Sequence, residues 1–198
     1  MSRRLRASAL GLLAGIGLSL AGCSQSPLTP GDLALNGVTP PIVAFASDGT
    51  VGYVWAPVGA DVDGSAPLPP SLPRRVSASN SIDGSRGGTV KVGRFTVRVP
   101  AGAFSGSATV TVSMPDSTVM ICDLGIAPVA ANGFRTPVEL TADLSAPGVA
   151  DASNFTMYWY DPARQVWVNL EMRSNHSGAS VKTALDHFSK YGAGKAGW

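Results

Sequence analysis

Ser107-Ala-Thr-Val-Thr-Val-Ser-Met114 is the stretch of sequence that decides the fold. Its apolar side chains, at Ala108, Val110, Val112 and Met114, alternate with small polar ones. Because successive side chains of a β-strand point to opposite faces, this alternation predicts a strand with one buried face.

The same alternation recurs on both sides of this stretch. The other apolar positions are Val90 and Val92; Phe95, Val97 and Val99; Val138, Leu140 and Leu144; Phe155, Met157 and Trp159; Val166, Val168 and Leu170; and Ala179, Val181, Thr183 and Leu185. No segment shows sustained helical spacing, and glycine or proline interrupts the chain roughly every ten residues. The sequence therefore predicts an all-β fold, a single antiparallel β-sandwich over residues 81–191, followed by a tail at 192–198.

The first residues resemble a bacterial lipoprotein signal. Three arginines precede an uncharged run from Ala7 to Leu20, which is short for a membrane span but typical of a secretory signal. The run closes with Leu20-Ala-Gly-Cys23, which resembles a lipobox. The resemblance implies that residues 1–22 are a signal peptide, that Cys23 is acylated, and that the protein is lipid-anchored in the bacterial cell envelope, outside the cytoplasm. The alternatives are an ordinary signal peptide with a chance cysteine, and twin-arginine export, which Arg6 disfavours.

Charge argues against nucleic acid as a partner. Cleavage before Cys23 removes three of the fifteen lysines and arginines and none of the thirteen acids, which leaves twelve basic and thirteen acidic residues. A chain with this balance has no electrostatic footprint for nucleic acid. The resemblance to a lipobox implies the membrane, reached through Cys23, as a partner.

Residues 23–80 are rich in proline and glycine and are predicted to form a flexible tether. Within it, β-prone residues on both sides of Asp48-Gly49 predict a hairpin over residues 42–55. The sequence leaves open whether this hairpin packs on the sandwich. Asp61-Val-Asp-Gly-Ser65 superficially resembles a calcium loop, but it lacks the later bidentate glutamate, and no metal is predicted.

Part of the chain is similar to the ZU-five domain, a β-sandwich of ankyrins, zonula occludens proteins and netrin receptors. The similarity starts at Gly87-Gly-Thr-Val90 and Phe95-Thr-Val-Arg-Val-Pro-Ala-Gly-Ala-Phe104, and continues with Ser107–Val112 and Gly133–Leu140. It covers roughly residues 87–189. Because the eukaryotic members bind other proteins, the resemblance implies a non-enzymatic interaction or structural module.

One tripeptide inside this resemblance carries possible chemistry. His187-Phe188-Ser189 matches a sequence that some ZU-five relatives cut between the phenylalanine and the serine. The Ser189 hydroxyl would attack the Phe188 carbonyl, with His187 as the base. In the structural alternative, Phe188 fills the core, His187 faces solvent and Ser189 caps a turn.

Aromatic side chains offer a further candidate site. Tyr158 and Tyr160 lie on the face of a predicted strand opposite Trp159, where an exposed pair would stack on a sugar or anchor an envelope protein. Trp55 and Trp198 are candidates for extending that patch. Carbohydrate binding is therefore a third functional hypothesis. The alternative, which the sequence favours, is that these aromatic residues form cross-strand pairs that stabilise the hairpin.

The remaining candidate residues favour structural roles. Cys122 lies in an apolar run and is predicted to be a buried, inert thiol. His176 lies in a polar segment predicted to be a turn, and the two histidines lack the flanking ligands of a zinc site. Asp143, Asp151 and Asp161 are predicted at strand ends or turns. No cofactor is predicted.

Overall fold

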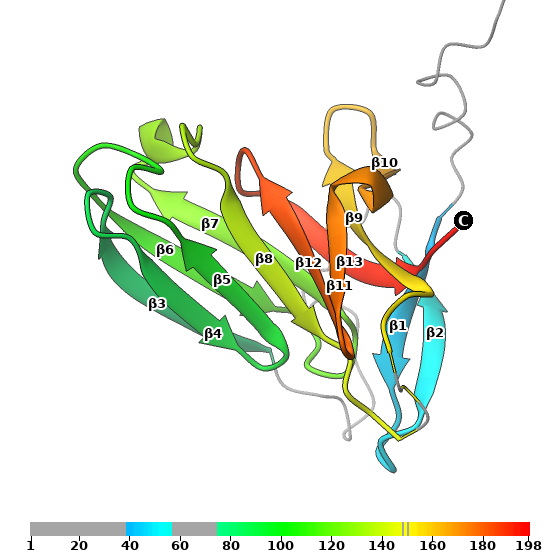
Figure 1. Cartoon of the computed structure of the whole chain (residues 1–198). Helices are drawn as coiled ribbons and strands as arrows, with labels where there is room; N and C mark the ends of the chain where they lie inside the picture. Colours follow the sequence, from blue (N-terminus) through cyan, green and yellow to red (C-terminus); the bar gives the residue numbers. More distant parts are fainter. Residues whose placement is uncertain (1–38, 57–74, 148, 150) are drawn as a thin grey trace, which may run out of the picture.

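Two antiparallel β-sheets packed face to face form the protein in a computed structural model (Figure 1). The structure describes residues 39–56, 75–147, 149 and 151–198. The predictions for the signal peptide, for Cys23, for the loop at Asp61 and for most of the tether lie outside these residues. Every strand pair is antiparallel, and no α-helix occurs within the described residues. The prediction of an all-β sandwich is confirmed.

The larger sheet has eight strands. They are β1 (Pro41–Phe45), β2 (Val51–Trp55), β3 (Val76–Asp83), β6 (Ser107–Met114), β7 (Ile121–Ala127), β9 (Phe155–Asp161), β10 (Val166–Asn169) and β13 (Lys190–Lys195). Six of them follow the order β10-β9-β13-β7-β6-β3, while β1 pairs with β13 and with β2.

The smaller sheet has five strands in the order β11-β12-β8-β5-β4. They are β4 (Gly88–Val92), β5 (Phe95–Val99), β8 (Val138–Asp143), β11 (Ser174–Ser177) and β12 (Ser180–Leu185). Two short 3-10 helices, η2 (Val129–Ala131) and η3 (Glu171–Arg173), lie in connections. Figure 1 shows β5, β8 and β12 lying across β6, β7 and β13.

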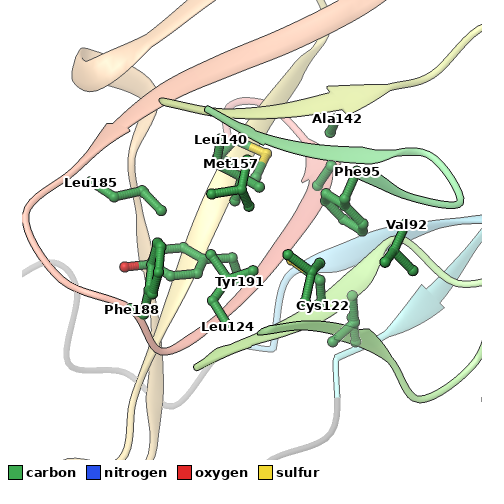
Figure 2. Close-up of a cluster of buried hydrophobic side chains, with 14 of the residues drawn as sticks. Val92, Phe95, Cys122, Leu124, Leu140, Ala142, Met157, Leu185, Phe188 and Tyr191 are labelled. Atoms are coloured by element: carbon green, nitrogen blue, oxygen red, sulfur yellow. The ribbon is translucent and has the colours of Figure 1, made fainter. Parts of the chain in front are cut away.

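The core lies between the sheets, as the alternation predicts. In β6, the side chains of Val110, Val112 and Met114 are fully buried, while Thr109 is exposed. Figure 2 shows Cys122, Leu124 and Tyr191 of the larger sheet facing Phe95, Leu140 and Leu185 of the smaller one. Each large apolar side chain buried in this way stabilises the fold by roughly 1.5–3 kcal/mol.

The sandwich extends beyond the predicted limits of 81–191. Strand β3 begins at Val76, inside residues 23–80 of the predicted tether, and β13 continues to Lys195 through residues of the predicted tail. Alternation did not reveal these ends because β3 is mostly polar and β13 contains two glycines.

The predicted hairpin is present as β1 and β2, and it is part of the sandwich. Thr50 donates its amide hydrogen to the Asp48 carboxylate at 2.9 Å in the connecting turn, where Gly49 has a φ of 82°. The buried strand β1 pairs with β13, and Met120 donates its backbone N–H to the Val43 carbonyl at 2.8 Å. The four residues 52–55 of β2 are exposed.

Candidate functional site

The predicted cleavage tripeptide lies in the connection between β12 and β13, where the chain crosses from one sheet to the other. Phe188 is 4% exposed and points into the core (Figure 2). Its ring meets the Phe134 ring edge to face, with the centroids 4.8 Å apart. Phe188 therefore fills the core, as the structural alternative expects.

Both backbone groups of Phe188 bond to one side chain. The Phe188 N–H donates to Asn132 Oδ1 at 2.6 Å, and Asn132 Nδ2 donates to the Phe188 carbonyl oxygen at 3.0 Å. Asn132 follows η2, whose Val129 carbonyl accepts its backbone N–H. The amide of Asn132 thus polarises the carbonyl that Ser189 would attack, which is the position of an oxyanion donor.

Ser189 makes hydrogen bonds through its backbone and its hydroxyl, and neither goes to the His187 ring. Its carbonyl accepts the Leu124 N–H at 2.9 Å, and its hydroxyl donates to the Tyr160 carbonyl at 3.4 Å. The His187 ring lies edge to face against Trp159, with the centroids 5.1 Å apart, and the His187 carbonyl accepts the Tyr191 hydroxyl at 2.7 Å.

This arrangement supplies some parts of an acyl-transfer site. The nucleophile and the electrophilic carbonyl adjoin in sequence, and Asn132 supplies a donor to that carbonyl. A general base must lie within hydrogen-bond reach of the proton that it removes, whereas the His187 ring packs on Trp159. No residue of the tripeptide has a positive φ.

A hollow of about 250 Å³ opens beside His187. Its lining includes Trp159, Leu170 and the pair Arg173 and Asp186, whose Nη2 and Oδ2 atoms lie 2.7 Å apart. The Trp159 Nε1 atom is buried and has no hydrogen-bond partner. The sequence gives no signal for this hollow, because the side chains that line it come from β9, the segment of η3, β12, β13 and the β12–β13 connection.

The prediction that Tyr158 and Tyr160 form an exposed binding pair is wrong, because Tyr158 is buried. This residue is 2% exposed, and its hydroxyl donates to the Lys195 carbonyl at 2.6 Å. Burial raises the pKa of Tyr158 to about 12. Tyr160 is half-buried between Trp167, at 5.4 Å between centroids, and Lys190, whose Nζ lies 5.5 Å from the ring centroid. Tyr158 is therefore not available to a glycan or a partner.

Trp55 and Trp198 form a separate aromatic group away from Tyr160. Their ring centroids are 5.2 Å apart, and both side chains are exposed. Trp55 lies at the end of β2, which pairs only with β1 among the described strands. Because Tyr158 is buried, there is no exposed tyrosine pair on β9 for them to extend.

Cys122 is fully buried in β7, as predicted. Burial raises the pKa of its thiol well above the ordinary range, which disfavours the reactive thiolate. His176 is not in a turn: it belongs to β11, an exposed polar strand without apolar alternation, and its Nε2 lies 2.7 Å from the Phe155 carbonyl oxygen.

The three aspartates lie at strand ends or in a connection, as predicted: Asp143 ends β8, Asp161 ends β9, and Asp151 lies shortly before β9. Asp143, Asp151 and Asp161 accept backbone N–H groups two residues ahead at 2.7–2.9 Å. The hydrogen bonds from Ser145 and Ser153 lower the pKa values of Asp143 and Asp151. Across the described part of the chain, His, Cys, Asp and Glu side chains form no group of three that could hold a metal ion.

A helix long and apolar enough to cross a membrane is not found among the described residues. In comparisons with known proteins, no protein-family model matches the chain and no curated protein matches it.

Proposed function

We propose that the protein is a lipoprotein of the bacterial cell envelope, and that its β-sandwich is a non-enzymatic interaction or structural module. The observation that supports lipid anchoring is the sequence Leu20-Ala-Gly-Cys23 at the end of an uncharged run. In support of the module, His187 and Ser189 are engaged in packing and backbone contacts instead of bonding to each other.

Two chemical markers of acylation test the anchor. Cells that express the full chain are labelled with palmitate, with and without globomycin, which blocks the lipoprotein signal peptidase. We expect labelled mature protein in the membrane fraction, and unprocessed precursor under globomycin. Cys23→Ser should lose both label and membrane retention, whereas Cys122→Ser should keep them, because Cys122 is buried in the fold. An unlabelled wild-type protein would overturn the proposal.

The second candidate function is self-cleavage between Phe188 and Ser189, and the Asn132 contact favours it. The Ser189 oxygen would form a bond to the Phe188 carbonyl carbon while His187 takes the hydroxyl proton and passes it to the departing Ser189 nitrogen. Water would then hydrolyse the resulting ester to a Phe188 carboxylate and the Ser189 hydroxyl. Asn132 would stabilise the negative charge that develops on the carbonyl oxygen.

Mass spectrometry of the purified chain tests this candidate. Cleavage gives a species that ends at Phe188, and Ser189→Ala should abolish it. Asn132→Ala should slow its appearance by about 10²–10³-fold, as loss of an oxyanion donor does. A single intact mass after prolonged incubation over a range of pH, with the fold verified by circular dichroism, would rule self-cleavage out.

A further inference from the structure

Exposed apolar side chains lie along β2 and at Trp198, with Tyr53 and Trp55 on one face of the strand and Val54 on the other. Tyr53, Val54 and Trp55 of β2 are 49%, 39% and 61% exposed, and Trp198 is 49% exposed. We call these four residues the Trp55 cluster. They are four of the six large hydrophobic residues that are exposed within the described residues. Exposed apolar side chains scattered singly are ordinary, whereas a group of them marks an interaction surface.

The cluster lies where the chain enters the fold. Trp55 is the register partner of Pro41, the first residue of β1, and Ala56 donates its backbone N–H to the Pro40 carbonyl at 3.1 Å. Trp198 meets Trp55 at the same end. Figure 1 shows the C mark beside the start of β1. The aromatic pair therefore flanks the point at which the segment that follows Cys23 joins the sandwich.

This position places the cluster at the end of the domain that the segment from Cys23 joins. Fifteen residues lie between Cys23 and Thr39, and a chain of this length spans at most about 60 Å even when fully extended. The entry point is the described part of the fold that is nearest to Cys23 along the chain. If Cys23 carries lipid, the Trp55 cluster is at the end of the domain to which the anchor is connected.

The chemistry of the cluster suits a bilayer interface. Tryptophan and tyrosine combine an apolar ring with one polar group, and they concentrate at the headgroup level of membranes. Strand β2 carries no charge, so it lacks the lysines that usually protect an exposed edge strand from other chains. The exposed Lys195 of β13 lies three residues before Trp198, where its cation can meet lipid phosphate.

From this placement we propose that the Trp55 cluster contacts the headgroup region of the membrane that holds the anchor. This inference rests on the proposed function, because acylated Cys23 brings the cluster to the bilayer. The contact would give the sandwich a defined orientation, with β2 toward the lipid.

Short-range quenching of tryptophan fluorescence tests this contact. The lipidated full chain is reconstituted into phosphatidylcholine vesicles with or without bromine on the acyl chains. We expect the brominated lipid to quench part of the emission. The double variant Trp55→Phe, Trp198→Phe should lose the quenched component. The matched control Trp159→Phe, Trp167→Phe should keep it, because Trp167 is buried and the Trp159 ring packs against His187. Circular dichroism verifies that each variant is folded.

The outcomes separate this inference from the proposed function. A palmitate-labelled chain that stays on the vesicles without quenching overturns the contact and leaves the anchor standing. Quenching that persists in the Trp55→Phe, Trp198→Phe variant also overturns it. A chain without acyl label overturns the anchor, and the contact with it. If instead the Cys23→Ser chain forms dimers without lipid and Trp55→Ser abolishes them, the occupant is a second copy and the membrane contact is wrong.

Discussion

Asn132 holds Phe188 in the way that a neighbouring β-strand would. Its side-chain oxygen accepts the Phe188 N–H at 2.6 Å, and its side-chain nitrogen donates to the Phe188 carbonyl at 3.0 Å. The two residues are 56 positions apart in the sequence. Phe188 lies in the connection between a strand of one sheet and a strand of the other, so its backbone N–H and carbonyl have no strand partner. The side-chain amide of Asn132 takes the place of that partner.

Asn132→Ala is expected to lower the free energy of unfolding by about 2–4 kcal/mol, because it leaves the Phe188 N–H and carbonyl without partners. Urea denaturation followed by circular dichroism measures the loss. Asn132→Asp keeps an acceptor for the N–H but removes the donor to the carbonyl, and we expect an intermediate loss. The control Asn175→Ala, on exposed β11, should change stability by no more than about 0.5 kcal/mol. An equal effect of Asn132→Ala and Asn175→Ala would contradict the role of Asn132.

The sequence predicts the sandwich because its strands alternate cleanly. Val110 and Val112 are fully buried, and Phe188 lies in the core, as alternation and apolar character indicate. Asn132 gives no such signal: a polar residue after a proline-led turn is ordinary, and its partner is remote in the sequence. The self-cleavage motif was visible in the sequence, but the contacts of its members depend on tertiary packing.

The prediction that Tyr158 is exposed is wrong, because its burial depends on a neighbouring strand and not on the alternation within β9. Tyr158 is on the outer face of β9, and it is buried because β13 presents glycine beside it. A β-carbon on Gly194 would lie 3.1 Å from Tyr158 Cε2. The glycines of β13 break the apolar alternation, so the sequence predicts a tail at residues 192–198. The same absence of a side chain at Gly194 lets the Tyr158 ring pack across β13.

Gly194→Ala is expected to loosen the β1–β2 hairpin. The added β-carbon would lie 2.5 Å from the Pro41 carbonyl oxygen, so β1 must move away from β13. Overpacking of this kind costs roughly 1–3 kcal/mol. Gly125→Ala is the matched control, since nothing lies within 4 Å of its added β-carbon and it too is in a strand of the larger sheet. Urea denaturation and hydrogen exchange at residues 42–45 would report both effects, and equal protection in the two variants would refute the clash.

Alanine substitutions at Gly87 and Gly106 distinguish the cost of backbone strain from the cost of steric crowding. Both have a positive φ, 73° and 75°, so alanine is strained at either position by roughly 1–2 kcal/mol. At Gly87 the β-carbon would also lie 2.3 Å from the Val99 carbonyl oxygen, whereas nothing lies within 4 Å at Gly106. We expect Gly87→Ala to lower the urea midpoint distinctly more than Gly106→Ala. If the two midpoints coincide, the packing of Gly87 against β5 is wrong.

Stability should fall in alkaline solution. Burial raises the pKa of the Cys122 thiol above its usual 9.0 and the pKa of Tyr158 from 10.0 to about 12, and it raises the pKa of Tyr191 as well. Between its unfolded and folded pKa values, each group keeps its proton in the folded state and loses it in the unfolded state. The unfolded state then binds fewer protons, so the free energy of unfolding decreases as pH rises. The stabilisation is complete below pH 9 and is lost through the folded pKa values.

Urea midpoints of the Cys23→Ser chain between pH 7 and 11 measure this dependence, with decline expected from about pH 9. In Cys122→Ala the thiol contribution is absent, so the decline should begin about one pH unit later, when the tyrosines of the unfolded chain start to ionise. The comparison uses the onset of the decline, because the alanine variant also loses packing at every pH. A midpoint that is flat or rising between pH 9 and 11 would mean that these three groups are solvated in the folded protein.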